Sequence, residues 1–182
     1  MKRKRQENPQ KALSLEGITT ALLDLMQEKP YKEIAITELS DKANLSRRTF
    51  YRHFDSTDAV IDHHLKNLCD ELLVLFEEIV KTQQRDFAFV VEVFFAFWVK
   101  HKEFLAVLHD NDLAYQSLQK FWSEVRTRLL GDNLSNYTLD YMYYFTSGAM
   151  TNLLIKWIEE GAIRSPKEMG TIASRVLEHL SS

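Results

Sequence analysis

The 182-residue chain has little of what many fold and function classes require, with one cysteine, five glycines and three prolines. The single thiol, Cys69, cannot form an internal disulfide, and no Cys and His spacing suits zinc, which excludes a disulfide scaffold and a zinc finger. So few glycines and prolines disfavour β-sandwiches, β-barrels and glycine-rich phosphate loops. The composition instead favours helices, in a chain that we expect to fold in a reducing, cytoplasmic compartment.

Targeting signals and enzyme motifs are missing as well. No apolar stretch follows the basic start MKRKRQENPQKA, and no uncharged apolar run reaches about eighteen residues, so neither a secretory signal nor a membrane span is expected. The histidines lack HxxxH or HExxH spacing, and the chain contains no G-x-S-x-G elbow. We therefore expect no enzyme, no catalytic residues, no metal and no cofactor.

Charge is unevenly placed along the chain. Residues 1–55 carry 11 lysines and arginines against 8 aspartates and glutamates, whereas the remaining residues carry 12 against 18. This asymmetry indicates a basic module that meets an anion, followed by an acidic body that does not.

Apolar residues spaced by three and four predict amphipathic helices at the start of the chain. The first spans 9–28 and a short one spans 37–43. Asn44 suits the left-handed corner of a tight turn, and Ser46 caps a new helix over 47–54. Two short helices joined by about three residues form a helix-turn-helix, whose second helix lies in the DNA major groove.

The rest of the chain predicts a body of further helices. Their expected ranges are 55 to about 82, 87–100, 103–109, 112–130, 135–160 and one that opens at Ser165. Gly161 is typical of a left-handed C-cap, and Ser165-Pro166-Lys167-Glu168 combines an N-cap serine, a first-turn proline and a capping-box glutamate. The sequence thus predicts an all-α chain, with a three-helix DNA-binding domain over 1–55 and a helical bundle over 56–182.

The string ITELSDKANLSRRTFYRHFDSTDAV, residues 36–60, resembles the helix-turn-helix of the tetracycline-repressor (TetR) family of bacterial transcription regulators. The family pattern is a short helix, an Ala-Gly-Val type corner and then Ser-x-x-Thr-(Phe/Leu)-Tyr-x-His-Phe. In this chain residues 43–45 stand at the corner, and residues 46–54 match the Ser-x-x-Thr string that follows it. The resemblance implies a regulator that binds double-stranded DNA at a two-fold operator, most often a repressor released by a small-molecule effector. It also implies that the helical bundle over 56–182 is the regulatory and dimerisation domain.

Two positions depart from the family pattern. Thr57 stands where most members have a lysine, so one phosphate contact is lost or weakened. Ala35 replaces the threonine that in the family caps the helix before the turn, here the one over 37–43, and Thr37 is a possible substitute. The basic arm over residues 1–8 either adds phosphate or minor-groove contacts or is a tail without function.

The residue types on the helix over 47–54 predict that some of its side chains contact bases and others contact phosphates. Arg47 and Arg48 lie in its first turn, where arginine pairs well with guanine O6 and N7. Tyr51 and His53 suit phosphate oxygens, which fix register. The complete predicted DNA-binding set is Thr37, Ser46, Arg47, Arg48, Thr49, Tyr51, Arg52 and His53, in which Thr49 contacts a thymine methyl or a phosphate and Arg52 takes either role. The alternative is an ordinary helical pair whose arginines are merely solvated.

The body is rich in aromatic residues, which either fill the core or line a pocket. Regulators of the TetR family usually bind a small effector among the body helices. The predicted pocket lining is Phe94, Trp98, Phe121, Trp122 and Tyr144.

The segment YYFTSGAMTNLLIKWIEEGAIRSPKEMG resembles the end of the regulatory domain in one TetR subgroup, whose last two helices pair with those of a second subunit. This resemblance predicts a homodimer contact at Met150, Leu153, Leu154, Trp157, Ile158, Ile172, Val176 and Leu180. A monomeric core would use the same residues, but a helix-turn-helix at a two-fold operator needs a dimer. Two other functions stay open, namely a regulator controlled by a partner protein and a helical ligand-binding module that binds no DNA.

Overall fold

The computed structural model describes residues 9–82, 86–130 and 137–180. Within these ranges the chain forms nine α-helices and one 3-10 turn, with no strand, which confirms the all-α prediction. The chain divides into two compact units, over residues 1–64 and 65–182. In the described ranges, no helix combines the length and apolar character that crossing a bilayer requires.

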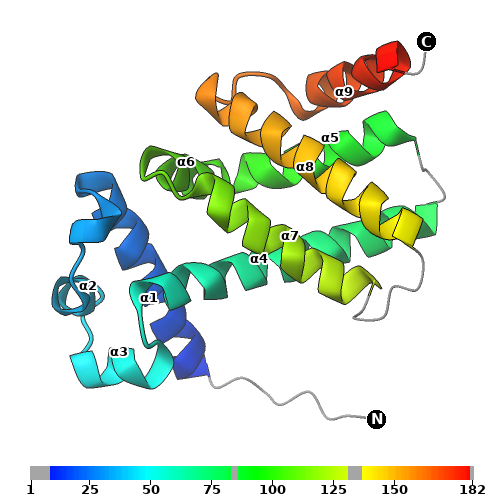
Figure 1. The fold of residues 1–182 in the computed structure, drawn as a ribbon. Coiled ribbons are helices and arrows are strands. Elements are labelled where there is room, and N and C mark those ends of the chain that lie inside the picture. The colour runs from blue at the N-terminus through cyan, green and yellow to red at the C-terminus, as the bar shows by residue number, and fades with distance from the viewer. Residues whose placement is uncertain (1–8, 83–85, 131–136, 181–182) are drawn as a thin grey trace, which may run out of the picture. The chain divides into compact units, whose positions relative to one another are not determined.

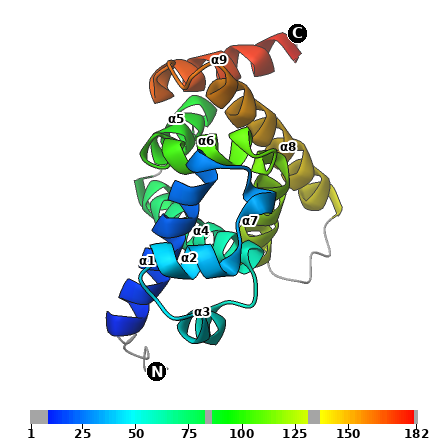
Figure 2. The same ribbon diagram turned by 90° about the vertical axis from the view of Figure 1, so that its left-hand side faces the viewer.

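The first unit contains the helix-turn-helix. Its elements are α1 (Pro9–Glu28), a 3-10 turn η1 (Tyr31–Glu33), α2 (Ile36–Lys42), α3 (Arg47–His53) and the first turns of α4 (Thr57–Thr82). Figures 1 and 2 show α2 and α3 lying across one another at a wide angle. The helices expected over 9–28, 37–43 and 47–54 are all confirmed, to within one residue at each end.

The core of this unit explains the apolar spacing of α1. Ile18, Leu22 and Leu25 are at most 2% exposed. Leu39 of α2 and Phe50 of α3, in the same unit, are each fully buried. Because α2 and α3 bury one face each against this core, their opposite faces are left to solvent.

The second unit is built from the rest of α4 and five further helices. These are α5 (Phe87–Lys100), α6 (Lys102–Asp110), α7 (Ala114–Leu130), α8 (Tyr137–Glu159) and α9 (Pro166–Leu180). The helices expected over 87–100, 103–109 and 112–130 are confirmed, whereas the expected start of the next helix at Ser135 lies outside the described residues.

Helix α5 supplies the aromatic centre of the second unit, as its apolar sequence predicts. Phe94, Phe95 and Trp98 are at most 1% exposed. Phe95 meets Trp157 of α8 edge-on at 5.5 Å between ring centroids, and Trp98 meets Phe121 of α7 at the same distance. These rings therefore join three helices in one core.

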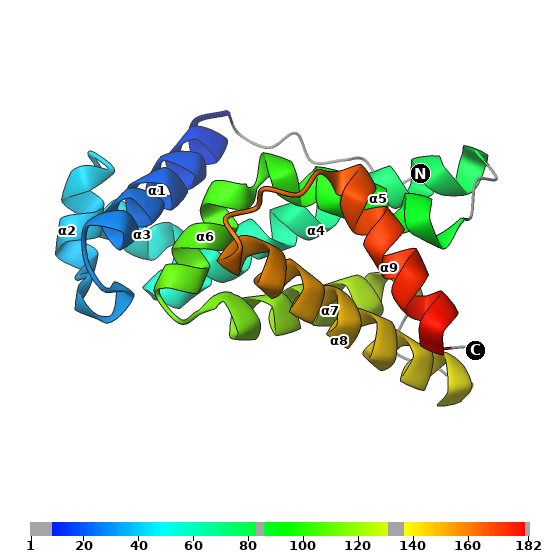
Figure 3. The same cartoon turned by 90° about the horizontal axis from the view of Figure 1, so that it is seen from above.

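Helix α9 packs mainly against α5 (Figures 1 and 3). Gly170 of α9 lies directly against the α5 backbone. A Cβ atom at that position would lie 2.4 Å from the carbonyl oxygen of Ala88 and 3.2 Å from its carbonyl carbon. The absence of a side chain at Gly170 therefore sets the depth to which α9 can approach α5.

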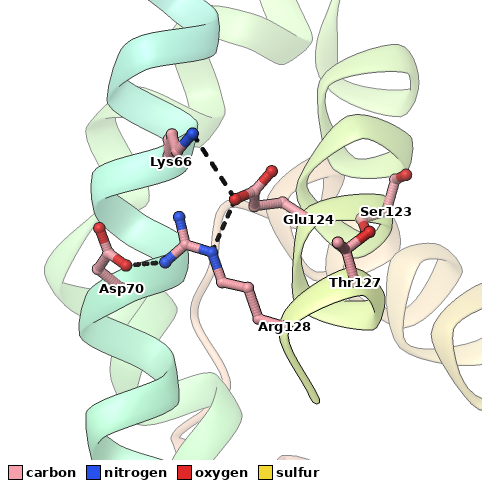
Figure 4. Close-up of polar contacts among 6 residues, drawn as sticks. All are labelled: Lys66, Asp70, Ser123, Glu124, Thr127 and Arg128. Atoms are coloured by element: carbon pink, nitrogen blue, oxygen red, sulfur yellow. Dashed lines mark hydrogen bonds and ion pairs between the residues drawn. The ribbon is translucent and has the colours of Figure 1, made fainter. Parts of the chain in front are cut away.

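Ion pairs join α4 to α7 within the second unit (Figure 4). Arg128 pairs with Asp70 of α4 and, through Nε at 2.7 Å, with Glu124 one turn earlier on α7. Lys66 of α4 lies 3.9 Å from the same Glu124 carboxylate. We call these four residues the α4–α7 charge cluster. Its side chains remain partly exposed, from 26% at Arg128 to 60% at Lys66 and Asp70, so solvent and salt screen it.

The start of α9 has the capping box that the sequence predicts. The Glu168 carboxylate accepts hydrogen bonds from the Ser165 amide (2.8 Å) and hydroxyl (2.6 Å), and the Glu168 amide donates to the Ser165 hydroxyl. The bonds from Ser165 lower the pKa of Glu168. Gly161, at φ 78°, ends the preceding turn in the left-handed conformation.

We expect Ser165→Ala to lower Tm by a few degrees near neutral pH, because the start of α9 loses its N-cap. A carboxyl whose folded pKa is depressed stabilises the fold above its unfolded pKa and loses that contribution as pH falls through the folded value. The Tm difference between Ser165→Ala and wild type should therefore shrink below about pH 4. Thermal unfolding at several pH values checks this, and a difference that does not change with pH would contradict it.

Candidate DNA interface and body pocket

The turn between α2 and α3 is a Schellman-type C-cap. Asn44 has φ 54°, its amide donates to the Asp41 carbonyl (3.0 Å), and the Leu45 amide donates to the Ser40 carbonyl (2.9 Å). Asparagine tolerates this left-handed conformation better than most side chains do. The corner that the sequence predicts at Asn44 is thus confirmed.

Ser46 fixes the beginning of α3. Its Oγ accepts a hydrogen bond from the Thr49 amide (3.1 Å) and lies 2.9 Å from the Thr49 hydroxyl. The predicted N-cap is confirmed, and it also holds the Thr49 side chain. Both hydroxyls therefore have a structural role besides the DNA contacts predicted for them.

The exposed face of α3 carries three arginines and a tyrosine. Arg47, Arg48, Tyr51 and Arg52 are all exposed, with Tyr51 at 50%. Residues four apart share a helix face, so Arg47 and Tyr51 are neighbours, as are Arg48 and Arg52. His53 is only partly exposed.

The opposite face of α3 anchors it in the core. Phe50 is fully buried and Phe54 is 7% exposed. The Phe50 ring meets the Tyr51 ring edge-on at 5.6 Å, and the Phe54 ring lies 5.6 Å from His63 of α4. A short helix anchored in this way presents its arginines from a fixed backbone.

Tyr31, which the sequence analysis did not single out, ties η1 to the start of α4. Its hydroxyl donates to the Asp58 carboxylate at 2.5 Å and is hydrogen-bonded to the Thr57 hydroxyl at 3.0 Å. Burial, and next the bond to Asp58, raise the pKa of Tyr31, which therefore stays neutral. The three residues hold together the segments on either side of the helix-turn-helix.

Two family profiles match the chain. One, described as bacterial regulatory proteins of the tetR family, matches residues 18–63. The other, described as a transcriptional regulator C-terminal region, matches residues 88–179, which is half of the chain. The chain belongs to the TetR family. A comparison with curated proteins gives no significant match.

The two departures from the TetR pattern have visible places in the fold. Thr57 is the first residue of α4 and holds Tyr31, as described above. Ala35 is the N-cap of α2 and makes no side-chain cap hydrogen bond, and Thr37 lies exposed in the first turn of that helix. The basic arm over residues 1–8 lies outside the described residues.

A pocket of about 240 Å³ lies between α7 and α8 of this TetR family member. Helix α7 lines it with Gln119, Trp122, Ser123 and Arg126, and α8 lines it with Tyr143, Tyr144, Ser147, Gly148 and Thr151. The Tyr143 hydroxyl, which burial keeps neutral by raising its pKa, donates to the Trp122 carbonyl and closes one side. Gly148 has open space where a side chain would stand, because no atom outside the neighbouring backbone of α8 lies within 4 Å of that position.

Of the five residues predicted to line an effector pocket, Trp122 and Tyr144 border this one. Phe94, Trp98 and Phe121 are at most 1% exposed and do not border it. Phe94 nevertheless stacks on Trp122 at 5.5 Å and 19° between ring planes, so it supports the pocket wall from behind. The sequence did not indicate that polar residues such as Arg126 line a pocket, because the α7 and α8 residues that border it together are distant in the chain.

The residues predicted for a dimer contact differ in exposure. Met150, Leu154 and Trp157 are at most 8% exposed within the single chain. Leu153, Ile158 and Ile172 are partly exposed, Val176 is 50% exposed, and the side chain of Leu180 lies outside the described residues. The first three therefore have too little free surface to contact a second chain without rearrangement.

The first half of α8 leaves a band of large side chains uncovered. Tyr137, Tyr141 and Phe145 follow one another at spacings of four and are 66–77% exposed, and Met142 beside them is 56% exposed. They border a shallow groove of about 370 Å³. We call these four residues the α8 aromatic band. A contiguous exposed surface of large apolar side chains is typical of an interaction site.

Proposed function

We propose that this chain is a homodimeric, sequence-specific repressor that acts in the cytoplasm and is released from its operator by a small effector bound in the body. In this proposal residues 1–55 bind DNA and residues 56–182 bind the effector and a second copy. The exposed arginines and tyrosine on α3 carry it, because this face is basic, is borne by an anchored helix and has the residue types that contact base edges and phosphates.

A two-fold operator requires two copies of α3 about 34–36 Å apart, one DNA turn. The α8 aromatic band supports pairing through α8, since it offers apolar surface that the single chain does not cover. Among the residues predicted for the contact, Leu153 of α8 is partly exposed and Val176 of α9 is exposed. The proposed dimer contact thus combines the predicted residues that remain accessible with the band.

The proposal is tested by selecting duplexes from a random-sequence DNA pool with the purified chain. We expect recovery of an inverted repeat with one consistent half-site spacing. Recovery of no enriched sequence would reject the function, and recovery of single, unpaired half-sites would reject the dimer.

Within the selected operator we expect Arg48→Ala to weaken binding by about 1–3 kcal/mol and to relax one base position, because arginine contacts a base edge. Tyr51→Phe should weaken all duplexes similarly, since a phosphate contact carries no sequence information. Titrations against the operator and against single-base variants separate the two effects. Lys100→Ala, which removes an exposed cation from α5 outside both proposed contacts, is the control and should leave binding unchanged. A sequence-selective loss at Tyr51 would contradict this division of labour.

A further inference from the structure

The pocket between α7 and α8 has a lining of one charge sign. Arg126 is the charged residue among those that border it, and no aspartate or glutamate is among them. The remaining lining combines rings with an amide and hydroxyls that can donate hydrogen bonds. From this composition we infer that the pocket binds a small planar organic acid, whose carboxylate pairs with Arg126 and whose ring lies among the aromatic side chains. This inference rests on the proposed role of the body as the effector domain.

Arg126 is held so that part of its guanidinium remains available. Its Nε and Nη2 donate to one oxygen of Asp140, at 2.9 and 2.7 Å. Asp140 does not itself border the pocket. Because a guanidinium has five N–H donors, the contacts with Asp140 leave Nη1 to donate to a carboxylate. The ion pair thus positions the arginine while its free edge selects for an anion.

The rings suit a flat ligand. Trp122 is backed by Phe94, and the Tyr144 ring lies 6.0 Å from the Arg126 guanidinium carbon. Tyr144 is 60% exposed, so it can move without disturbing the core. A planar acid between these rings would gain stacking contacts together with its charge-assisted bonds.

Thr151 borders the cavity although the residue is only 2% exposed. Its hydroxyl can donate or accept a hydrogen bond, so it suits a ligand with a polar substituent. The volume of about 240 Å³ limits the acid to one or two rings.

Isothermal titration of the purified full-length chain with matched acid and amide pairs tests the inference. The probes are benzoate, 4-hydroxybenzoate and 1-naphthoate, each with its uncharged amide. We expect at least one acid to bind about tenfold or more tightly than its amide, because only the acid forms a charge-assisted pair. Trp122 fluorescence should change on binding, and Trp122→Phe should remove that change, which locates the site.

Substitutions on α7 and α8 provide the controls. Arg126→Gln should abolish the preference for acid over amide, whereas Arg128→Gln, two residues along α7 and away from the pocket, should keep it. Gly148→Leu fills the open space in the pocket and should abolish binding of acids and amides alike. This second variant keeps the inference testable if Arg126→Gln folds poorly.

The inference is overturned if amides bind as tightly as acids, if the preference survives in folded Arg126→Gln, or if no acid binds at millimolar concentration. Operator binding by the same preparation separates this failure from a failure of the proposed function. A chain that binds its operator but no acid retains the proposed function and rejects the inference. A chain that binds an acid at this site but no operator supports the inference and rejects the proposed function.

Discussion

Tyr141→Glu combined with Phe145→Glu should convert the chain to a monomer and weaken operator binding by about 10²- to 10⁴-fold, because the two half-sites are no longer bound together. These side chains are 74% and 66% exposed, so the charges are tolerated in the single chain but not in an apolar contact. Light scattering gives the mass in solution, and titration with the selected operator gives the affinity.

Val74→Glu is the matched control for this pair. Val74 is 58% exposed on α4, outside the proposed contact, and the variant should remain a dimer with unchanged affinity. If light scattering still gives the mass of a dimer for the Tyr141 and Phe145 double variant, the second copy is bound by another surface.

Gly170→Ala should lower stability by about 1–3 kcal/mol, the usual cost of inserting atoms into a well-packed contact. The added methyl group would meet the Ala88 carbonyl, and a backbone group on α5 cannot rotate aside as a side chain can. For a chain of this size each kcal/mol corresponds to about 2–4 °C in Tm. Thermal unfolding at one fixed protein concentration measures the shift.

Gly148→Ala is the contrasting substitution in the same unit. Gly148 lies inside α8, and a methyl group there would meet no atom within 4 Å beyond the neighbouring backbone of its own helix. Alanine is the better helix former by up to about 1 kcal/mol, so this variant should be unchanged or slightly more stable. Equal losses at Gly148 and Gly170 would contradict the close approach of α9 to α5.

The sequence was sufficient where local chemistry decides the structure. Asn44, Ser46 and the Ser165–Glu168 box act within a few residues of themselves, so their types and spacing predict the turn and the caps directly. The TetR pattern also predicts the buried and exposed sides of α3, because Phe50 and its neighbours occupy fixed positions on one short helix.

The sequence was insufficient where partners are far apart in the chain. Tyr31 and Asp58 are separated by 27 residues, and Arg126 and Asp140 by 14, so no periodicity connects them. The pocket shows the same limit, because Phe121 and Trp122 are adjacent aromatics of α7 and only Trp122 borders the cavity. Which ring faces a cavity depends on how α7 and α8 are packed, and apolar spacing does not contain that information.

The α4–α7 charge cluster affects how operator titrations should be analysed. Binding to DNA releases counterions, so the slope of log affinity against log salt concentration is commonly converted into a number of phosphate contacts. In this chain, added salt also weakens the pairs that Arg128 and Lys66 make between two body helices. If those pairs affect operator affinity, the slope measured on wild type contains a contribution from the body, and the slope of Arg128→Gln gives the better phosphate count.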